Sequence, residues 1–242
     1  MSQRNLLLQQ TGVYCHVFNR GINRDQIFFS SSGYTLFISF LRKYQASQPV
    51  TLLAYCLMPN HFHLIVRQNQ PYAIAAYMKN VCEHYAKAVN QWLGRSGHLF
   101  GSRYKISHID DPLYLLQLSR YVHLNPVKAG IVESALEWDH SSCRQYCGLT
   151  SADELEPDQI LSQAGGARQY QAFLEDPEAT YSEGSVKYMI DWGDDAAYPR
   201  CGTQGSSFRR GRLSRRVAAI HGPRQFETAN PEHAFPSRPY QP

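Results

Sequence analysis

The spacing of apolar residues divides the first half of the chain into short strands and longer helices. Residues 13–19, 50–57 and 61–67 are short runs rich in apolar, aromatic and β-branched side chains, a composition typical of strands. Residues 31–46 and 71–93 instead repeat apolar residues every three or four positions, which predicts two amphipathic helices.

One more strand and one more helix are predicted to follow. Residues 98–108 have the pattern of a strand or of one arm of a hairpin. The helix after them has Asp110 and Asp111 as candidate caps and Pro112 in its first turn, and we expect Pro126 to end it. The order β-α-β-β-α-β predicts an α+β fold, in which a split βαβ arrangement builds an antiparallel sheet with helices on its faces.

Two histidines flank one bulky apolar residue in the segment His61-Phe62-His63, which follows a predicted turn at Pro59-Asn60. Because side chains alternate along a strand, His61 and His63 should point the same way and Phe62 into the core. Two imidazoles on one face of a strand can share a divalent metal ion. Ordinary strand histidines without a metal are the alternative interpretation.

Tyr121 and Asn125 lie four residues apart in the last predicted helix, so they should share one face near its end. A tyrosine hydroxyl can attack phosphorus and form a covalent intermediate. An amide oxygen one turn later can reach the same metal ion as the histidines. By itself, this spacing also fits a tyrosine packed by its ring and an asparagine that marks the end of a helix.

Together these segments resemble the REP-associated tyrosine transposases, which are single-tyrosine HUH nucleases of the IS200-like class. The resemblance covers roughly residues 12–148, and the order and spacing of its motifs make it specific. Besides the histidine hairpin, the motifs are Tyr14-Cys15-His16-Val17-Phe18-Asn19-Arg20-Gly21, Gly97-His98-Leu99-Phe100-Gly101-Ser102-Arg103-Tyr104-Lys105, Ser119-Arg120-Tyr121-Val122-His123-Leu124-Asn125-Pro126-Val127-Lys128-Ala129-Gly130, and Trp138 followed by Ser141-Ser142.

The resemblance implies a ferredoxin-like sheet of the HUH nuclease fold and an enzyme that nicks and joins single-stranded DNA. It implies that Tyr121 forms a covalent 5′-phosphotyrosine and that His61, His63 and Asn125 bind Mg²⁺ or Mn²⁺. The substrates would be single-stranded repeats that fold into REP-like hairpins. The alternative is a hairpin DNA-binding or RNA-binding protein on the same fold that does not catalyse. Candidate DNA contacts in the first domain are Arg20, Arg103, Tyr104 and Lys105.

Charge divides the chain into two parts. Residues 1–150, the expected transposase domain, carry 14 Lys and Arg residues against 7 Asp and Glu residues, which suits a polyanionic partner. Residues 151–242 are expected to form a partly flexible C-terminal extension, which is acidic up to residue 195 and basic afterwards. Its basic cluster, which includes Arg209, Arg210 and Arg212, is either a DNA-binding arm or a solvated tail.

The remaining composition favours a protein of the cytoplasm, and the resemblance implies a bacterial one. Six cysteines without a repeated Cys-x2-Cys spacing suggest reduced thiols rather than a disulfide framework. The sequence shows neither a long apolar run that would span a membrane nor an apolar signal core at its start. We expect a monomer, with a dimer as the alternative, that associates with the nucleoid when it binds DNA.

Overall fold

Four antiparallel strands in the order β2-β3-β1-β4 form the sheet of this protein in the computed structural model, which describes residues 3–151 and 155–176. The described elements are α1 Gln3–Leu8, β1 Val13–Arg20, η1 Ile22–Arg24, α2 Ser31–Gln45, β2 Val50–Met58, β3 His61–Gln68, α3 Ala73–Trp92, β4 Lys105–Ile109, α4 Pro112–Lys128, η2 Ala135–Glu137, α5 Cys143–Tyr146, α6 Asp158–Ala164 and α7 Ala167–Glu175. This order and strand pairing confirm the predicted α+β fold with a split βαβ sheet.

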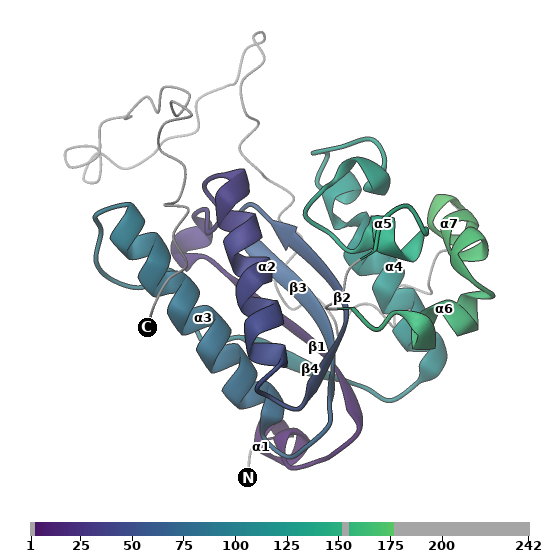
Figure 1. Cartoon of the computed structure of the whole chain (residues 1–242), viewed down its shortest axis with the longest axis horizontal. Coiled ribbons are helices and arrows are strands. Elements are labelled where there is room, and N and C mark those ends of the chain that lie inside the picture. Colours follow the sequence, from purple (N-terminus) through teal and green to yellow (C-terminus); the bar gives the residue numbers. More distant parts are fainter. Residues whose placement is uncertain (1–2, 152–154, 177–242) are drawn as a thin grey trace, which may run out of the picture. The chain divides into compact units, whose positions relative to one another are not determined.

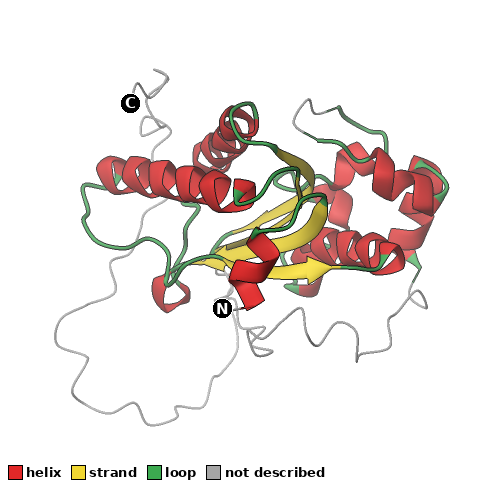
Figure 2. Ribbon diagram, turned by 90° about the horizontal axis from the view of Figure 1, so that it is seen from below, coloured by secondary structure: helices red, strands yellow, loops and turns green. Residues whose placement is uncertain are grey.

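Helices cover both faces of the sheet. Helices α2 and α3 lie on one face, and α4 with the shorter helices α5–α7 lies on the other (Figures 1 and 2). Side chains alternate between these layers along β3. Phe62 is fully buried and its ring contacts Phe37 of α2, whereas His63 contacts Tyr121 of α4. The alternation predicted from the sequence is therefore confirmed.

Two predicted element ends are wrong. The fourth strand begins at Lys105 rather than at residue 98, because residues 97–104 form a loop held on the end of β1. In that loop the amide of Gly101 donates to the carbonyl of Arg20 over 3.0 Å. The run of apolar residues reflects burial of Leu99, which is 2% exposed, and not a strand.

Helix α4 does not end at Pro126 but continues to Lys128. Proline cannot donate a helical hydrogen bond, yet its fixed φ is compatible with the helix. The ladder resumes after Pro126, because the amide of Ala129 donates to the carbonyl of Asn125 over 2.9 Å. The start of α4 is as predicted: Asp111 caps it by accepting a hydrogen bond from the amide of Leu113.

The outer edge of β2 is covered by segments that follow α4. The amide of Leu57 donates to the carbonyl of His140, and the amide of Glu156 donates to the carbonyl of Leu52. These bonds occupy backbone groups that would otherwise be exposed on an edge strand. They also attach the end of the described chain to the sheet.

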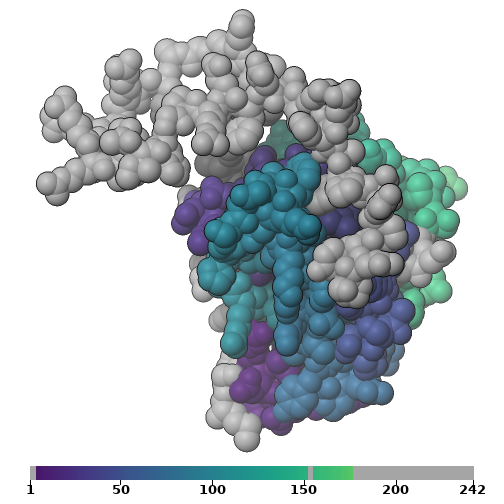
Figure 3. All heavy atoms as spheres, turned by 60° about the vertical axis from the view of Figure 1, so that its left-hand side comes forward, coloured from purple at the N-terminus to yellow at the C-terminus, as the bar shows by residue number. Residues whose placement is uncertain are grey.

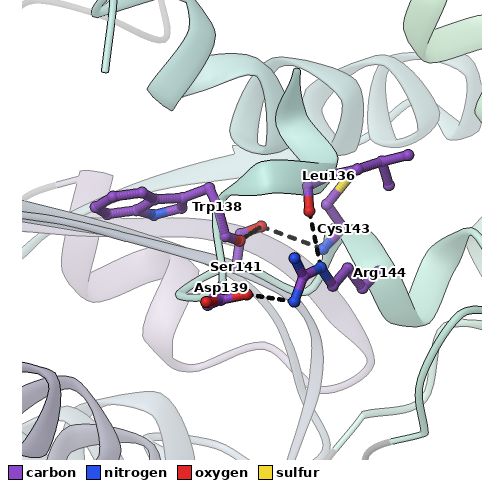
Figure 4. Close-up of polar contacts among 6 residues, drawn as sticks. All are labelled: Leu136, Trp138, Asp139, Ser141, Cys143 and Arg144. Atoms are coloured by element: carbon purple, nitrogen blue, oxygen red, sulfur yellow. Dashed lines mark hydrogen bonds and ion pairs between the residues drawn. The ribbon is translucent and has the colours of Figure 1, made fainter. Parts of the chain in front are cut away.

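Side-chain bonds shape the segment 136–144 before it reaches β2. Arg144 donates to the carbonyl of Leu136 over 2.7 Å and pairs with the carboxylate of Asp139. Ser141 donates to the carbonyl of Trp138 and accepts from the amide of Cys143 (Figure 4). This folded turn fixes Ser142, which lies between α4 and β2.

Helix α3 lies on the surface of the molecule (Figure 3). Lys79, Glu83 and Lys87 are exposed along its outer side, and Lys87 pairs with Glu83 at 2.7 Å. None of the helices in the described part of the chain combines the length and the apolar character that a membrane crossing requires.

Replacing Phe62 by alanine should lower the free energy of unfolding by about 3–5 kcal/mol, because the change leaves a cavity between the sheet and α2. Urea denaturation followed by circular dichroism measures the difference. The matched control is Leu113→Ala, whose side chain is 61% exposed and should change stability by about 0.5 kcal/mol or less. Equal losses in the two variants would contradict this core assignment.

Candidate active site

The turn at Pro59-Asn60 presents His61 and His63 on the face of the sheet that α4 covers. Their ring centroids are 5.0 Å apart and the rings are perpendicular. Asn60 holds His61 through a 2.7 Å contact between its Oδ1 and the imidazole Nδ1. The Nδ2 of Asn60 donates to the carbonyl of Arg24, which fixes the orientation of the amide. The amide oxygen must therefore accept from Nδ1–H, so the lone pair of His61 is on Nε2.

His63 is held from the other side by a third histidine. His16 of β1 places its Nε2 2.9 Å from Nδ1 of His63, and both side chains are buried. Phe18 stacks on His16 with 4.7 Å between ring centroids. When the Nδ1–H of His63 donates to His16, the Nε2 of His63 carries a lone pair. His16 was a sequence candidate for this neighbourhood, and the strand register between β1 and β3 brings it there.

All three histidines are neutral near pH 7. Burial lowers the pKa of His16 to about 3. Burial, with a smaller contribution from the charge of Arg20, lowers the pKa of His61 to about 4. The pKa of His63 lies well below its ordinary value because of burial first and then the charges of His61 and His16. Neutral imidazoles are the form that binds metal ions.

Tyr121 lies edge-on to the ring of His63, with 5.8 Å between the ring centroids. Its side chain is 9% exposed. The Nδ2 of Asn125 donates to the backbone carbonyl of Tyr121 over 2.9 Å, so Tyr121 and Asn125 share one side of α4 as predicted. This bond uses the amide nitrogen of Asn125 and leaves its oxygen as the acceptor.

Lys128 is a residue of this neighbourhood that the sequence analysis did not single out. Its ammonium lies 4.5 Å from the centroid of the Tyr121 ring. Burial, and then the charge of Arg120, lowers the pKa of Lys128. The spacing of seven residues from Tyr121, about two helical turns, is the signal that would have placed Lys128 on the same face.

The donor set at the hairpin suits a metal ion. Two neutral imidazoles come from one strand, the tautomer of His61 is set by Asn60, and an amide oxygen is available on α4. Among residues 3–151 and 155–176, no group of three His, Cys, Asp or Glu side chains could hold a metal ion, so a carboxylate does not complete the set. A metal bound by His61 and His63 would keep positions for oxygen ligands such as water or phosphate.

Three of the four predicted DNA contacts of the first domain, Arg20, Arg103 and Tyr104, line two hollows near the end of β1 and the start of β4. A pocket of about 580 Å³ is lined by Arg20, Arg24 and the loop at Gly101–Ser102. Arg103 is exposed, and with Tyr104 it lines a second hollow of about 780 Å³ beside α3.

Neither Tyr104 nor Lys105 lies on an open surface that DNA could reach directly. Tyr104 is 8% exposed, and the guanidinium of Arg4 lies 4.4 Å from its ring centroid, so stacking on a base would require Arg4 to move. Lys105 is half-buried at the start of β4. The basic cluster with Arg209, Arg210 and Arg212 lies outside the described residues.

Two further histidines have structural partners of their own. His123 is fully buried, and its two ring nitrogens contact Tyr170 and Ser142. The ring of His140 stacks on Tyr34 with 3.7 Å between centroids. Neither histidine contacts the pair at the hairpin.

Comparison with known proteins identifies relatives of the domain that carries this site. Residues 9–125 match the family described as Transposase IS200 like. A protein of Haemophilus influenzae named as a REP-associated tyrosine transposase is 30% identical over 106 residues, which cover 39% of this chain. The chain spans 59% of the length of that relative.

A solved structure has the same fold. It is described as a REP-associated tyrosine transposase bound to a REP hairpin, and it superposes with a TM-score of 0.50. The match covers 61% of this chain and 92% of the other, with 16% sequence identity. The expected HUH nuclease fold is thereby confirmed.

The stability of the protein should fall as the pH is lowered from about 6.5 towards 3. In this range the unfolded chain protonates its histidines, whereas His16 and His123, both with a pKa of about 3, stay neutral in the folded protein. Each contributes a slope of up to about 1.4 kcal/mol per pH unit to the free energy of unfolding. Urea denaturation between pH 4 and 7 should give a shallower slope for His16→Phe than for the parent protein. Equal slopes would contradict the buried neutral state of His16.

Proposed function

We propose that this protein nicks and rejoins single-stranded hairpin DNA with Tyr121 as its nucleophile, because residues 9–125 match the family described as Transposase IS200 like. The observation that carries the proposal is the edge-on contact of Tyr121 with His63, beside His61, within one chain. A nucleophile next to two neutral imidazoles has the arrangement that phosphoryl transfer through a covalent intermediate requires.

The proposed reaction breaks one phosphodiester bond and forms another. The Oη of Tyr121 attacks phosphorus and loses its proton to solvent, while the bond from phosphorus to the 3′-oxygen breaks. The 3′-oxygen takes up a proton, which gives a free 3′-hydroxyl and a 5′-phosphotyrosine. Because the phosphotyrosine is also a phosphodiester, a second 3′-hydroxyl can reverse the step and join the strands without ATP.

Residues around Tyr121 would supply positioning and charge. The ring of Tyr121 lies between His63 and the ammonium of Lys128, which limits its movement. Lys128 would compensate for negative charge on the phosphate that Tyr121 carries after attack. Asn60 and His16 would orient His61 and His63 through their Nδ1 atoms.

A divalent ion fits this donor set, with His61, His63 and the amide oxygen of Asn125 as its protein ligands. When bound, Mg²⁺ or Mn²⁺ would supply positive charge that polarises a non-bridging oxygen of the scissile phosphate. The imidazoles favour Mn²⁺ in vitro, since Mg²⁺ prefers oxygen ligands.

The hairpin would bind along the basic first domain. The solved relative of the same fold is described as bound to a REP hairpin, which supports a hairpin as the partner of this chain. Arg20 is the described residue best placed to contact a phosphate near the site, because it lines the first hollow and lies opposite His61 in the strand register. Arg103, which lines the hollow beside α3, would contact DNA farther from the histidines. Action as a monomer stays a prediction.

Tyr121→Phe should abolish cleavage and leave hairpin binding nearly unchanged, because only the attacking hydroxyl is lost. The protein is incubated with Mn²⁺ and labelled single-stranded hairpins from its own genome and analysed on a denaturing gel. The parent should give a labelled band shifted by the mass of the protein. Tyr114→Phe, a tyrosine of the same helix whose pKa burial raises to about 12, is the matched control and should still form the adduct.

Other outcomes separate the alternatives. Cleavage by the parent without an adduct would mean that water is the nucleophile. Hairpin binding without either product would mean a non-catalytic binding protein. Normal cleavage by Tyr121→Phe would show that Tyr121 is not the nucleophile.

His63→Ala should weaken Mn²⁺ binding at least tenfold, because it removes a direct ligand, and should abolish metal-dependent cleavage. Isothermal titration of the DNA-free protein with Mn²⁺ measures the affinity independently of cleavage. The control is His108→Ala, whose side chain is exposed on β4 and should bind Mn²⁺ like the parent. Full cleavage by the parent in EDTA would exclude the proposed metal role.

A further inference from the structure

Helices α6 and α7 lie beyond residues 9–125, and their contacts converge on the part of α4 that carries Tyr121. The hydroxyl of Tyr170 in α7 lies 2.9 Å from Oγ of Ser119 and 2.8 Å from Nδ1 of His123. Ser119, Tyr170 and His123 are all fully buried. One hydroxyl of α7 therefore holds two residues of α4 that stand on either side of Tyr121 in sequence.

The Tyr170 contacts belong to a continuous series of short hydrogen bonds, which begins at Ser142 beside the sheet and ends in α4. Oγ of Ser142 lies 2.7 Å from Nε2 of His123, and Oγ of Ser119 donates to the carbonyl of Leu116 over 2.6 Å. One set of proton positions satisfies all four short contacts: Ser142 donates to His123, His123 to Tyr170, Tyr170 to Ser119, and Ser119 to Leu116. In this chain the Tyr170 hydroxyl must both accept and donate.

Arg120, the residue directly before Tyr121, is bound to the other end of α7. Its Nε donates to the carbonyl of Phe173 over 2.7 Å, and its Nη2 donates to the carbonyls of Leu174 and Asp176. These are carbonyls of the last turn of α7 and the residue after it, which have no helical partner of their own. A cation at this place also complements the helix dipole. The planar guanidinium thus fixes α4 to α7 in one orientation.

We propose that helices α6 and α7 form a brace, which fixes the rotation of α4 about its axis and its position along that axis. Tyr170 and Arg120 are then positioning residues for Tyr121. Successive helical residues are about 100° apart, so Ser119 and His123 lie about 160° from Tyr121 on the opposite side of α4. The brace therefore contacts the side of α4 that is opposite to the side carrying Tyr121. This inference rests on the proposed role of Tyr121.

Attack on phosphorus is sensitive to such positioning. A rotation of α4 by one residue would move Tyr121 by about 100° and about 1.5 Å along the axis. Even a misplacement of about 1 Å can lower a rate about 100-fold.

Tyr170→Phe tests the brace, because it removes one hydroxyl and keeps the ring. We expect the single-turnover cleavage rate at saturating hairpin to fall at least tenfold, with hairpin affinity unchanged. Tyr146→Phe is the matched control. It removes a fully buried hydroxyl that donates to the carbonyl of Leu53 over 2.8 Å, so it should cost similar stability and keep the parental cleavage rate. Arg120→Lys keeps a cation but not the planar fork and should also slow cleavage.

A second measurement reports the position of Tyr121 without depending on cleavage. With 3-fluorotyrosine incorporated at position 121, the parent and Tyr146→Phe should give one narrow fluorine resonance, and Tyr170→Phe a shifted or broadened one. An unchanged resonance and rate in Tyr170→Phe would overturn the brace, even if Tyr121→Phe is inactive as proposed. A changed resonance in Tyr170→Phe, with normal cleavage by Tyr121→Phe, would support the brace and refute only the nucleophile.

Discussion

The alternation of side chains along β3 is the constraint on which the rest of the site depends. Phe62 must face α2 and α3, because a fully buried aromatic ring contributes most when it is packed on all sides. His61 and His63 are then forced onto the opposite face, towards α4. A slip of one residue in the pairing with β1 and β2 would exchange these faces and bury both imidazoles in the aromatic layer. The stability of the core and the placement of the histidines thus have the same cause.

Burial explains why the histidines are suited to bind a cation. A protonated imidazole in this layer would lose its hydration, and the nearby charge of Arg20 further disfavours a positive charge on His61. The neutral form is therefore favoured, and with it the lone pair that coordinates metal. The contact with Asn60 places the lone pair of His61 on Nε2, and the lone pair of His63 is on Nε2 when its Nδ1–H donates to His16. The surroundings of the hairpin prepare two ligands before any ion binds.

Tyr121, the proposed nucleophile, is positioned differently, through bonds that residues distant from it make to α4. Helix α4 packs on the sheet beside β2, and the segment after it returns to cover the free edge of β2. Ser142 in that segment reaches His123, and α7 reaches Ser119, Arg120 and His123. The segment after α4 therefore both covers the edge of β2 and fixes the position of α4. Residues 155–176, which were expected to be part of the C-terminal extension, thus form bonds with the domain that carries the site.

The sequence by itself determined the strands, the histidine hairpin, and the common face of Tyr121 and Asn125. These features follow from the repeats of strand and helix, which act over a few residues and are set by backbone geometry. The same local rules misplaced the start of β4, because a buried loop at Leu99 and a strand have the same short apolar pattern.

Only the tertiary structure decided which residues meet. His16 and His63 are 47 residues apart and lie together because β1 pairs with β3. Tyr121 reaches His63, and Tyr170 reaches the back of α4, because of how helices pack on a sheet. Such contacts depend on the burial of many side chains at once, which no local pattern in the sequence encodes.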